Sequence, residues 1–260
     1  MTERHLPTPP SAAAGNPLIR FLRARLARDH HFGLPLSTGL LAVLSTALLF
    51  ALIAYEVHTH GALTRLDQQL ADWFNQRAFS PLTELVLGYT HLHGTIGVLV
   101  MGALLLRHMV HARQWPWVID LLLVLPGGML LNYLLKHLFA RLRPSFEDPL
   151  LVLHSYSFPS GHTIGATLLY AMLAAYVLNQ PALSAALARR LGCGQRGLHG
   201  AVAGATLLMV VLTAFSRVYL GAHFLSDVLG AMLLGTAWFA LWTTVVFTMQ
   251  RHYCGGMRSN

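Results

Sequence analysis

Residues 200–248 read GAVAGATLLMVVLTAFSRVYLGAHFLSDVLGAMLLGTAWFALWTTVVFT. Two apolar runs, near 200–216 and 224–248, flank a short polar stretch. Both lie within the range of about 17–25 residues that crosses a bilayer as a helix. Arg217 and Asp227 are the only Asp, Glu, Lys or Arg residues in the quoted sequence. It therefore predicts two membrane-spanning helices joined by a polar turn.

The rest of the chain has the same apolar character. Of its 260 residues, 55% are hydrophobic and 11% are charged, whereas soluble proteins average about 25% charged. Four further runs are long enough to span, near 36–55, 82–106, 117–136 and 162–179. The run 82–106 is interrupted by Glu84, His91 and His93. We therefore expect an all-α, polytopic membrane protein with a six-transmembrane-helix bundle over residues 36–250.

Basic residues predict the orientation of this bundle. The net charge of +8 comes largely from Lys and Arg in short loops between apolar runs, and such charge favours the cytoplasmic side. It therefore does not indicate nucleic-acid binding. With the N-terminus inside, twelve of the eighteen basic residues fall inside: Arg4, Arg20, Arg23, Arg25, Arg28, Arg107, Arg113, Arg189, Arg190, Arg196, Arg251 and Arg258. Both termini are thus expected to be cytoplasmic.

The two ends and the first outer loop carry weaker signals. Residues 1–35 comprise a Pro-rich, disordered tail and an Arg-rich segment, either an interfacial amphipathic helix or a charged flank of the first span. Residues 251–260 form a cytoplasmic tail. In the outer loop, Leu66, Leu70, Trp73 and Phe74 follow helical spacing, and Asp67, Gln69 and Asp72 take the other face. We expect either a short interfacial helix or a helix that caps the bundle.

The polar turn between the last two spans has a pattern suited to catalysis. His223 and Asp227 are four residues apart, so on a helix they share one face. A carboxylate that holds an imidazole fixes its tautomer and leaves the other nitrogen free to act as nucleophile or base. Arg217 supplies a planar donor fork suited to phosphate oxygens. The alternative is a surface ion pair at the start of a helix.

Two further motifs lie at the ends of spans. Lys136 and Arg143-Pro144 follow the third span, as phosphate ligands or as interfacial anchors. Arg141 between them could contact phosphate or lipid headgroups. The fourth span opens with Pro159-Ser160-Gly161-His162, in which Ser160 is expected to cap the helix and Gly161 allows a backbone N–H to approach an anion. The alternative is an ordinary capped helix with an incidental His.

Alternating spans place all three motifs on one side of the membrane, which the charge bias makes the outer side. Two His, an Asp, a Lys, two Arg and a helix N-terminus can then converge at one depth. Basic donors around a His nucleophile and a second His are typical of phosphoryl transfer, where catalysis is mainly positioning and stabilisation of charged oxygens.

Together these motifs resemble those of the type 2 phosphatidic acid phosphatase family: Lys136-x6-Arg143-Pro144, Pro159-Ser160-Gly161-His162 and Ser216-Arg217-x5-His223-x3-Asp227. The resemblance implies that His223 is the nucleophile that forms a phosphohistidine, that Asp227 holds it, and that His162 is the general acid. It also implies that the phosphate is bound by Lys136, Arg143, Ser160, Gly161 and Arg217, and that no metal or other cofactor is needed.

We therefore expect a lipid phosphatase in the plasma (inner) membrane, with its site facing the periplasm or exterior and the bilayer and a lipid phosphate as partners. Undecaprenyl diphosphate, phosphatidate and phosphatidylglycerol phosphate all fit as substrates. A lipid phosphotransferase is an enzymatic alternative, and a transporter or non-catalytic binding protein is another. His58-x-His60 and His91-x-His93 lack the carboxylate or Cys residues that would complete a metal site. The oligomeric state is not indicated.

Overall fold

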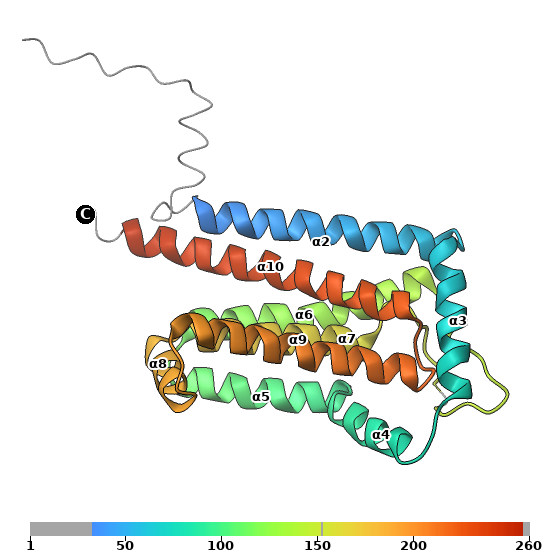
Figure 1. Cartoon of the computed structure of the whole chain (residues 1–260). Helices are drawn as coiled ribbons and strands as arrows, with labels where there is room; N and C mark the ends of the chain where they lie inside the picture. Colours follow the sequence, from blue (N-terminus) through green and yellow to red (C-terminus); the bar gives the residue numbers. More distant parts are fainter. Residues whose placement is uncertain (1–32, 152, 257–260) are drawn as a thin grey trace, which may run out of the picture.

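The computed structural model describes residues 33–151 and 153–256, with side chains up to residue 250. Within these ranges all regular secondary structure is helical. The helices are α2 (Leu34–His58), α3 (Ala62–Gln76), α4 (Leu82–Leu92), α5 (Thr95–His111), α6 (Trp115–Phe139), α7 (Gly161–Asn179), α8 (Pro181–Arg190), α9 (Gln195–Tyr219) and α10 (Leu225–Gly256) (Figure 1). The predicted disordered tail and the Arg-rich segment before residue 33 lie outside the described residues.

Five of these helices are long and apolar enough to cross a membrane, namely α2, α6, α7, α9 and residues 225–250 of α10. The pair α4 and α5 meets the same criterion together but bends by 48°, which gives up to six spans. The all-helical polytopic fold is therefore confirmed, and the segment predicted as the second span consists of two helices that meet at a bend. The break falls at His93 and Gly94, because the backbone of Gly94 is extended and the side chain of His93 is buried in the corner against Tyr170.

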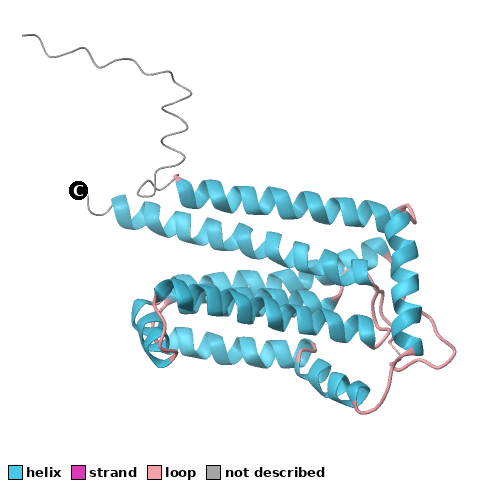
Figure 2. Ribbon diagram, viewed as in Figure 1, coloured by secondary structure: helices cyan, strands magenta, loops and turns pink. Residues whose placement is uncertain are grey.

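The loops that carry the three motifs lie at one end of the bundle. The segment between α6 and α7 and the turn between α9 and α10 are at this end, together with α3 (Figures 1 and 2). The short helix α8, the start of α2 and the end of α10 lie at the opposite end (Figure 1). The expected alternation of span direction is therefore present.

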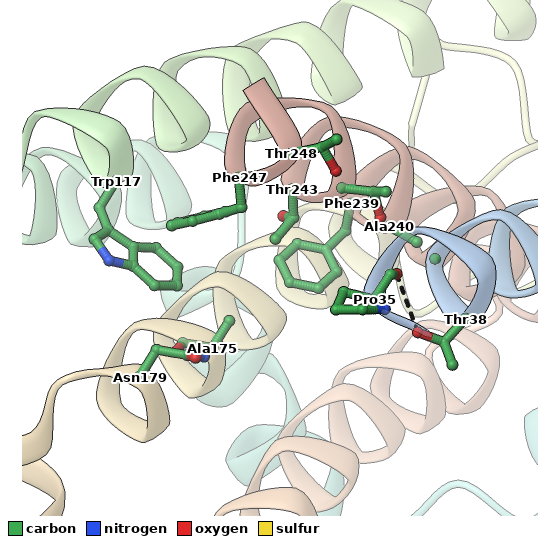
Figure 3. Close-up of a pocket in the computed structure, with 12 residues that line it drawn as sticks. Pro35, Thr38, Trp117, Ala175, Asn179, Phe239, Ala240, Thr243, Phe247 and Thr248 are labelled. Atoms are coloured by element: carbon green, nitrogen blue, oxygen red, sulfur yellow. Dashed lines mark hydrogen bonds between the residues drawn. The ribbon is translucent and has the colours of Figure 1, made fainter. Parts of the chain in front are cut away.

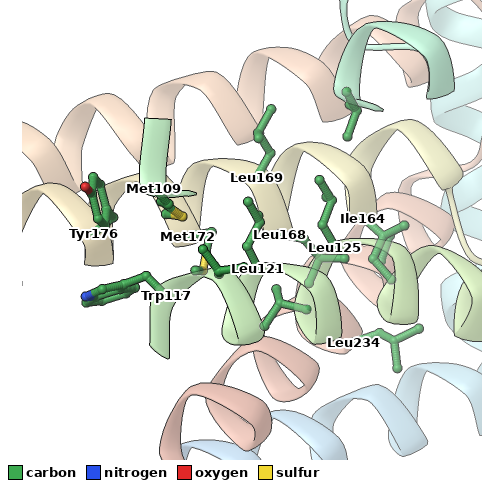
Figure 4. Packing of buried hydrophobic residues seen from close by; sticks show 14 residues of the cluster. Met109, Trp117, Leu121, Leu125, Ile164, Leu168, Leu169, Met172, Tyr176 and Leu234 are labelled. Carbon is green, nitrogen blue, oxygen red and sulfur yellow. The ribbon is translucent and has the colours of Figure 1, made fainter. Parts of the chain in front are cut away.

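Helix α7 lies in the middle of the bundle and provides much of its core. Half of its apolar segment is buried, compared with none of that of α2, which lies beside α10 on the outside. Its side chains Ile164, Leu168 and Met172 pack with residues of α5, α6 and α10 (Figure 4). This packing fixes the N-terminus of α7, which carries the second motif, against the end of α6.

Helix α3, expected from the first outer loop, crosses the end of the bundle (Figure 1). Its apolar side chains Leu66 and Trp73 are 44% and 48% exposed, whereas Asp67 is 1% exposed. The acidic side of α3 therefore faces the protein at Asp67, and its exposed side is partly apolar, which suits a membrane boundary.

Candidate active site

A cavity of about 390 Å³ at the loop end brings together side chains of all three motifs. Six of the eight predicted site residues line it: Lys136, Arg143, Gly161, His162, Arg217 and His223. The apolar residues Met129, Leu153 and Ile164 form another part of its wall. The cavity therefore combines a cationic, imidazole-containing part with an apolar part.

His223 and Asp227 are held by the turn between α9 and α10. Gly221 has a φ of +64°, and a Cβ there would lie 2.6 Å from the ring of Phe146, so the turn needs glycine. Asp227 Oδ2 accepts a hydrogen bond from the backbone N–H of Phe224 at 2.9 Å and lies 3.4 Å from His223 Nδ1. His223 is 2% exposed and Asp227 is fully buried. The pair predicted from their spacing is therefore formed inside the protein.

Arg143 occupies the other side of the His223 ring. Its Nη1 lies 3.1 Å from His223 Nε2 and also donates to the backbone carbonyl of Ala222, while Nε donates to the carbonyl of Ser155 at 2.6 Å. Burial, followed by the positive charge of Arg143, lowers the pKa of His223 well below its ordinary value. His223 is thus kept neutral, the form in which a ring nitrogen can attack phosphorus.

The loop before α7 gathers the ends of two motifs. Lys136 Nζ donates to the backbone carbonyls of Tyr156, at 2.5 Å, and Ser157, at 3.3 Å. Ser157 is fully buried and its hydroxyl donates to Asp227 Oδ2. The loop therefore connects the end of α6 to the carboxylate that holds His223.

The N-terminus of α7 differs in one respect from expectation. Ser160 occupies the N-cap position, but its hydroxyl makes no capping bond and instead accepts from Thr163 Oγ1 at 3.1 Å. The predicted N-cap position of Ser160 is therefore confirmed, but no side-chain capping bond is formed. Ser160 is fully buried and does not line the cavity. His162 lines the cavity and makes no hydrogen bond to the residues described. Its ring is therefore available to a ligand.

Arg217 is a buried cation with donors that have no partner within the described part of the chain. It is 1% exposed; its Nη1 donates to Thr90 Oγ1 at 2.7 Å, whereas Nε and Nη2 are buried without a hydrogen-bond acceptor. Burying a guanidinium without hydrogen-bond acceptors destabilises the folded state unless an anion accepts from its N–H groups. Because Arg217 lines the cavity, an oxyanion bound there could accept hydrogen bonds from both Nε and Nη2.

Comparison with known proteins agrees with this geometry. Residues 117–251 match the family model described as "PAP2 superfamily". The chain belongs to the PAP2 superfamily. It is 33% identical over 199 residues to the Bacillus subtilis (strain 168) protein named phosphatidylglycerophosphatase B, covering 76% of this chain and 91% of the relative. This match and the family together make the chain a phosphatidylglycerophosphatase-like membrane phosphatase.

A solved PAP2 structure is similar over most of the fold. The crystal structure of a transmembrane PAP2-type phosphatidylglycerolphosphate phosphatase from Bacillus subtilis superposes with a TM-score of 0.65 at 30% identity. The match covers 77% of this chain and 93% of the solved one. The arrangement of helices described above is therefore that of a membrane phosphatase of the PAP2 superfamily.

Sequence reasoning assigned Arg141 to phosphate or to lipid headgroups, which stays a prediction, and the structure shows two protein partners that were not expected. Its guanidinium bridges two buried carboxylates, with Nη1 2.5 Å from Asp227 Oδ1 and Nη2 2.8 Å from Asp67 Oδ2. It also lies over the ring of Phe224. Asp67, Ser157 and Thr90 were missed as neighbours of the PAP2 motifs, because each is remote from its partner in sequence.

The His-x-His pairs do not form a metal site in the described residues, where no group of three His, Cys, Asp or Glu is placed to hold an ion. His91 is exposed and contacts the carbonyl of Leu87, whereas His93 is buried and contacts Tyr170. His58 and His60 line a polar cavity that also reaches Arg141. Of these four residues, His93 is thus part of the packing, His58 and His60 line a cavity, and His91 lies at the surface.

A separate cavity of about 400 Å³ lies at the opposite end of the bundle (Figure 3). It is bounded by Pro35 and Thr38 at the start of α2, Trp117 at the start of α6, and Phe247 and Thr248 of α10. None of the described residues that line it is charged or belongs to a PAP2 motif. The described residues of the three PAP2 motifs therefore lie away from this cavity.

Proposed function

We propose that this protein hydrolyses the phosphate or diphosphate ester of a membrane lipid through a phosphohistidine on His223, at the outer face of the membrane. The observation that carries the proposal is the cavity in which His223, His162 and three cationic side chains meet an apolar wall. Such a cavity suits an anionic headgroup attached to an apolar chain. The names of the relatives make phosphatidylglycerol phosphate the first substrate to test.

In the first step, His223 Nε2 attacks the phosphorus atom and the bond from phosphorus to the leaving oxygen breaks. His162, protonated, gives its proton to that oxygen, so that the lipid leaves as an alcohol, or as a monophosphate when the substrate is a diphosphate. Lys136, Arg143 and Arg217 balance the charge on the equatorial oxygens. Arg143 must then move its hydrogen bond from Nε2 to a phosphate oxygen.

In the second step, water attacks the phosphohistidine and the bond from phosphorus to Nε2 breaks. His162, now neutral, accepts the proton of the water, and inorganic phosphate leaves. Asp227 stabilises the positive charge that His223 carries while phosphorylated. The cations provide the positive charge at the phosphate oxygens, so the proposed chemistry is metal-free.

The apolar wall supports a lipid substrate. Met129 and Tyr133 of α6 line the cavity, and Tyr133 is 58% exposed on the flank of that helix. Leu130 and Leu134 on the same helix are 58% and 56% exposed. A lipid chain could therefore leave the cavity along α6 toward the bilayer while its phosphate stays between the cations.

The test uses the full chain in mixed micelles with phosphatidylglycerol phosphate, phosphatidate and undecaprenyl diphosphate at equal surface concentrations. We expect phosphate release from at least one lipid and, with a labelled phosphate, an alkali-stable label on the protein. His223→Ala should abolish both, whereas His137→Ala, an exposed His next to Lys136, should change neither. Activity of His223→Ala within about tenfold of the wild type would overturn the proposal.

A further inference from the structure

We infer that Asp67 and Arg141 are positioning residues for catalysis, because they fix Asp227 through a chain of ion pairs that starts on α3. The relationship is a bridge: one guanidinium joins the carboxylate of α3 to the carboxylate of α10. The inference rests on the proposed role of the His223–Asp227 pair and extends the site to a helix outside the three PAP2 motifs.

The two carboxylate oxygens of Asp227 have different hydrogen-bond partners. Oδ1 accepts from Arg141 Nη1 at 2.5 Å, while Oδ2 accepts from the backbone of Phe224 and from Ser157 and faces His223 Nδ1. A carboxylate held at both oxygens cannot rotate. Arg141 thus keeps Oδ2 directed at the imidazole.

Asp67 holds Arg141 and the start of α10 together. Its Oδ2 accepts from Arg141 Nη2 at 2.8 Å and from the hydroxyl of Ser226 at 2.5 Å, and its Oδ1 accepts from the backbone N–H of Ser226 at 2.9 Å. Arg141 Nη1 also donates to the Ser226 hydroxyl at 2.7 Å. Asp67 is 1% exposed and Ser226 is fully buried, so these bonds are protected from water.

The charges explain why the arrangement needs both residues. Asp67 and Asp227 are both buried carboxylates, and a buried charge is costly unless it is paired. One guanidinium with a planar fork can pair with two carboxylates, whereas a Lys ammonium cannot present the same fixed geometry. Removal of Arg141 therefore leaves two buried carboxylates short of partners and frees Asp227 Oδ1, whereas removal of Asp67 leaves Arg141 without the partner that holds its Nη2.

The experiment compares Asp67→Asn and Arg141→Gln with two matched controls, Asp72→Asn on the same helix and Arg77→Gln at its end. Asp72 contacts Gln68 and Arg77 lies over Trp73, so neither touches the site. Per folded molecule, we expect kcat to fall roughly 10- to 100-fold in the test variants, as for outer partners that orient a reactive group. KM of the test variants should change little, and both kcat and KM of the control variants should stay close to those of the wild type.

Two further readouts separate positioning from support of the fold. If both residues act through one network, the double variant Asp67→Asn/Arg141→Gln should be no slower than the slower single variant, whereas independent effects would multiply. Arg141→Lys keeps the charge without the fork, and its kcat should lie between those of the wild type and Arg141→Gln.

The pH profile gives a direction that loss of structure does not predict. The charged groups facing the His223–Asp227 pair are Arg141, Arg143, Lys136, Arg217, His162 and, behind Arg141, Asp67. Loss of the Arg141 charge makes protonation of the pair easier, so the acid limb of kcat/KM should move to higher pH in Arg141→Gln. In Asp67→Asn the Arg141 charge acts on Asp227 alone, so the limb should not move to higher pH.

The inference is overturned if kcat per folded molecule of both test variants stays within about threefold of the wild type, or if Asp72→Asn loses as much. A lowered melting temperature with unchanged kcat would likewise make α3 a scaffold only. His223→Ala is measured in parallel. If it is inactive while the Asp67 and Arg141 variants keep kcat within about threefold of the wild type, the inference fails and the proposed function stands. If His223→Ala is active, the proposed function itself fails.

Discussion

The guanidinium of Arg143 donates to Nε2 of His223, the nitrogen proposed as the nucleophile, with Nη1 3.1 Å from Nε2. Because a guanidinium has no acceptor, Nε2 must offer its lone pair, and the ring hydrogen therefore belongs on Nδ1. Nδ1 lies 3.4 Å from Asp227 Oδ2, a long contact of the kind that tightens when substrate binds. The tautomer needed for attack on phosphorus thus follows from the two neighbours of the ring.

This relationship makes the carboxylate of Asp227 a determinant of kcat. Asp227→Asn keeps the shape of the side chain, but an amide placed with its NH2 toward Nδ1 favours the wrong tautomer and cannot stabilise the charged ring. We expect kcat to fall by two orders of magnitude or more, roughly, with a smaller change in KM. Steady-state kinetics on the substrate that is turned over best test this. A change in KM alone would make Asp227 a binding residue.

The pH dependence should reveal the buried state of His223. Burial and nearby cations lower its pKa, so the neutral, nucleophilic form should persist as the pH falls below about 6.5, the ordinary value for His. The acid limb of kcat/KM should therefore lie below that value, after correction for the substrate's own ionisation measured by ³¹P NMR. Arg143→Gln removes the closest cation and should move the residual limb to higher pH. A move to lower pH would contradict this account.

Arg217 should bind oxyanions only when Thr90 orients it. Thr90→Val removes the hydroxyl that accepts from Nη1. The guanidinium then loses its one hydrogen-bond partner among the described residues, and its two donors without an acceptor there, Nε and Nη2, lose their direction. We expect weaker inhibition by vanadate, a mimic of the transition state, by roughly 10-fold or more. Thr90→Ser, which restores the hydroxyl, should recover most of the affinity. Equal loss in both variants would indicate packing rather than orientation.

Local patterns in the sequence were sufficient to predict the spans and the motif residues. The apolar runs predict the helices, because a bilayer requires long apolar segments with internally paired backbone groups. The spacing of His223 and Asp227 predicts their contact on the assumption of a helix. The contact is present, but His223 lies in the turn before α10, which begins at Leu225. Alternating span direction then predicts that the motifs meet, as the cavity with Lys136, His162 and Arg217 shows.

What the sequence could not predict are pairings set by packing between distant segments. Asp67 and Arg141 are 74 residues apart, and their contact depends on how α3 crosses the end of the bundle. In the sequence, an Arg between two motif cations suits a phosphate ligand as well as it suits an ion pair. Only the structure shows that Arg141 contacts two carboxylates. The bend near Gly94 lies beside His91 and His93, which interrupt the run 82–106 in the sequence, but that interruption alone does not distinguish a bent helix pair from a straight span.

The side of the membrane on which the cavity opens is predicted from the charge bias and can be measured directly. Glu147 is exposed in the loop between α6 and α7, at the cavity end, and Arg196 is exposed at the start of α9, at the opposite end. Cysteine variants Glu147→Cys and Arg196→Cys, made in a Cys193→Ser/Cys254→Ser background, therefore report the two ends separately. Phosphatase activity of each variant shows that its fold is retained.

In intact cells, or in spheroplasts where an outer membrane is present, we expect an impermeant maleimide to label Glu147→Cys. Arg196→Cys should react only after permeabilisation, because the bias of Lys and Arg predicts that the end with Arg189 and Arg190 is inside. An outward cavity could act on a carrier lipid left in the outer leaflet, such as undecaprenyl diphosphate, but would not reach a lipid phosphate confined to the inner leaflet. Labelling of Arg196→Cys alone would invert the topology and favour an inner-leaflet substrate instead.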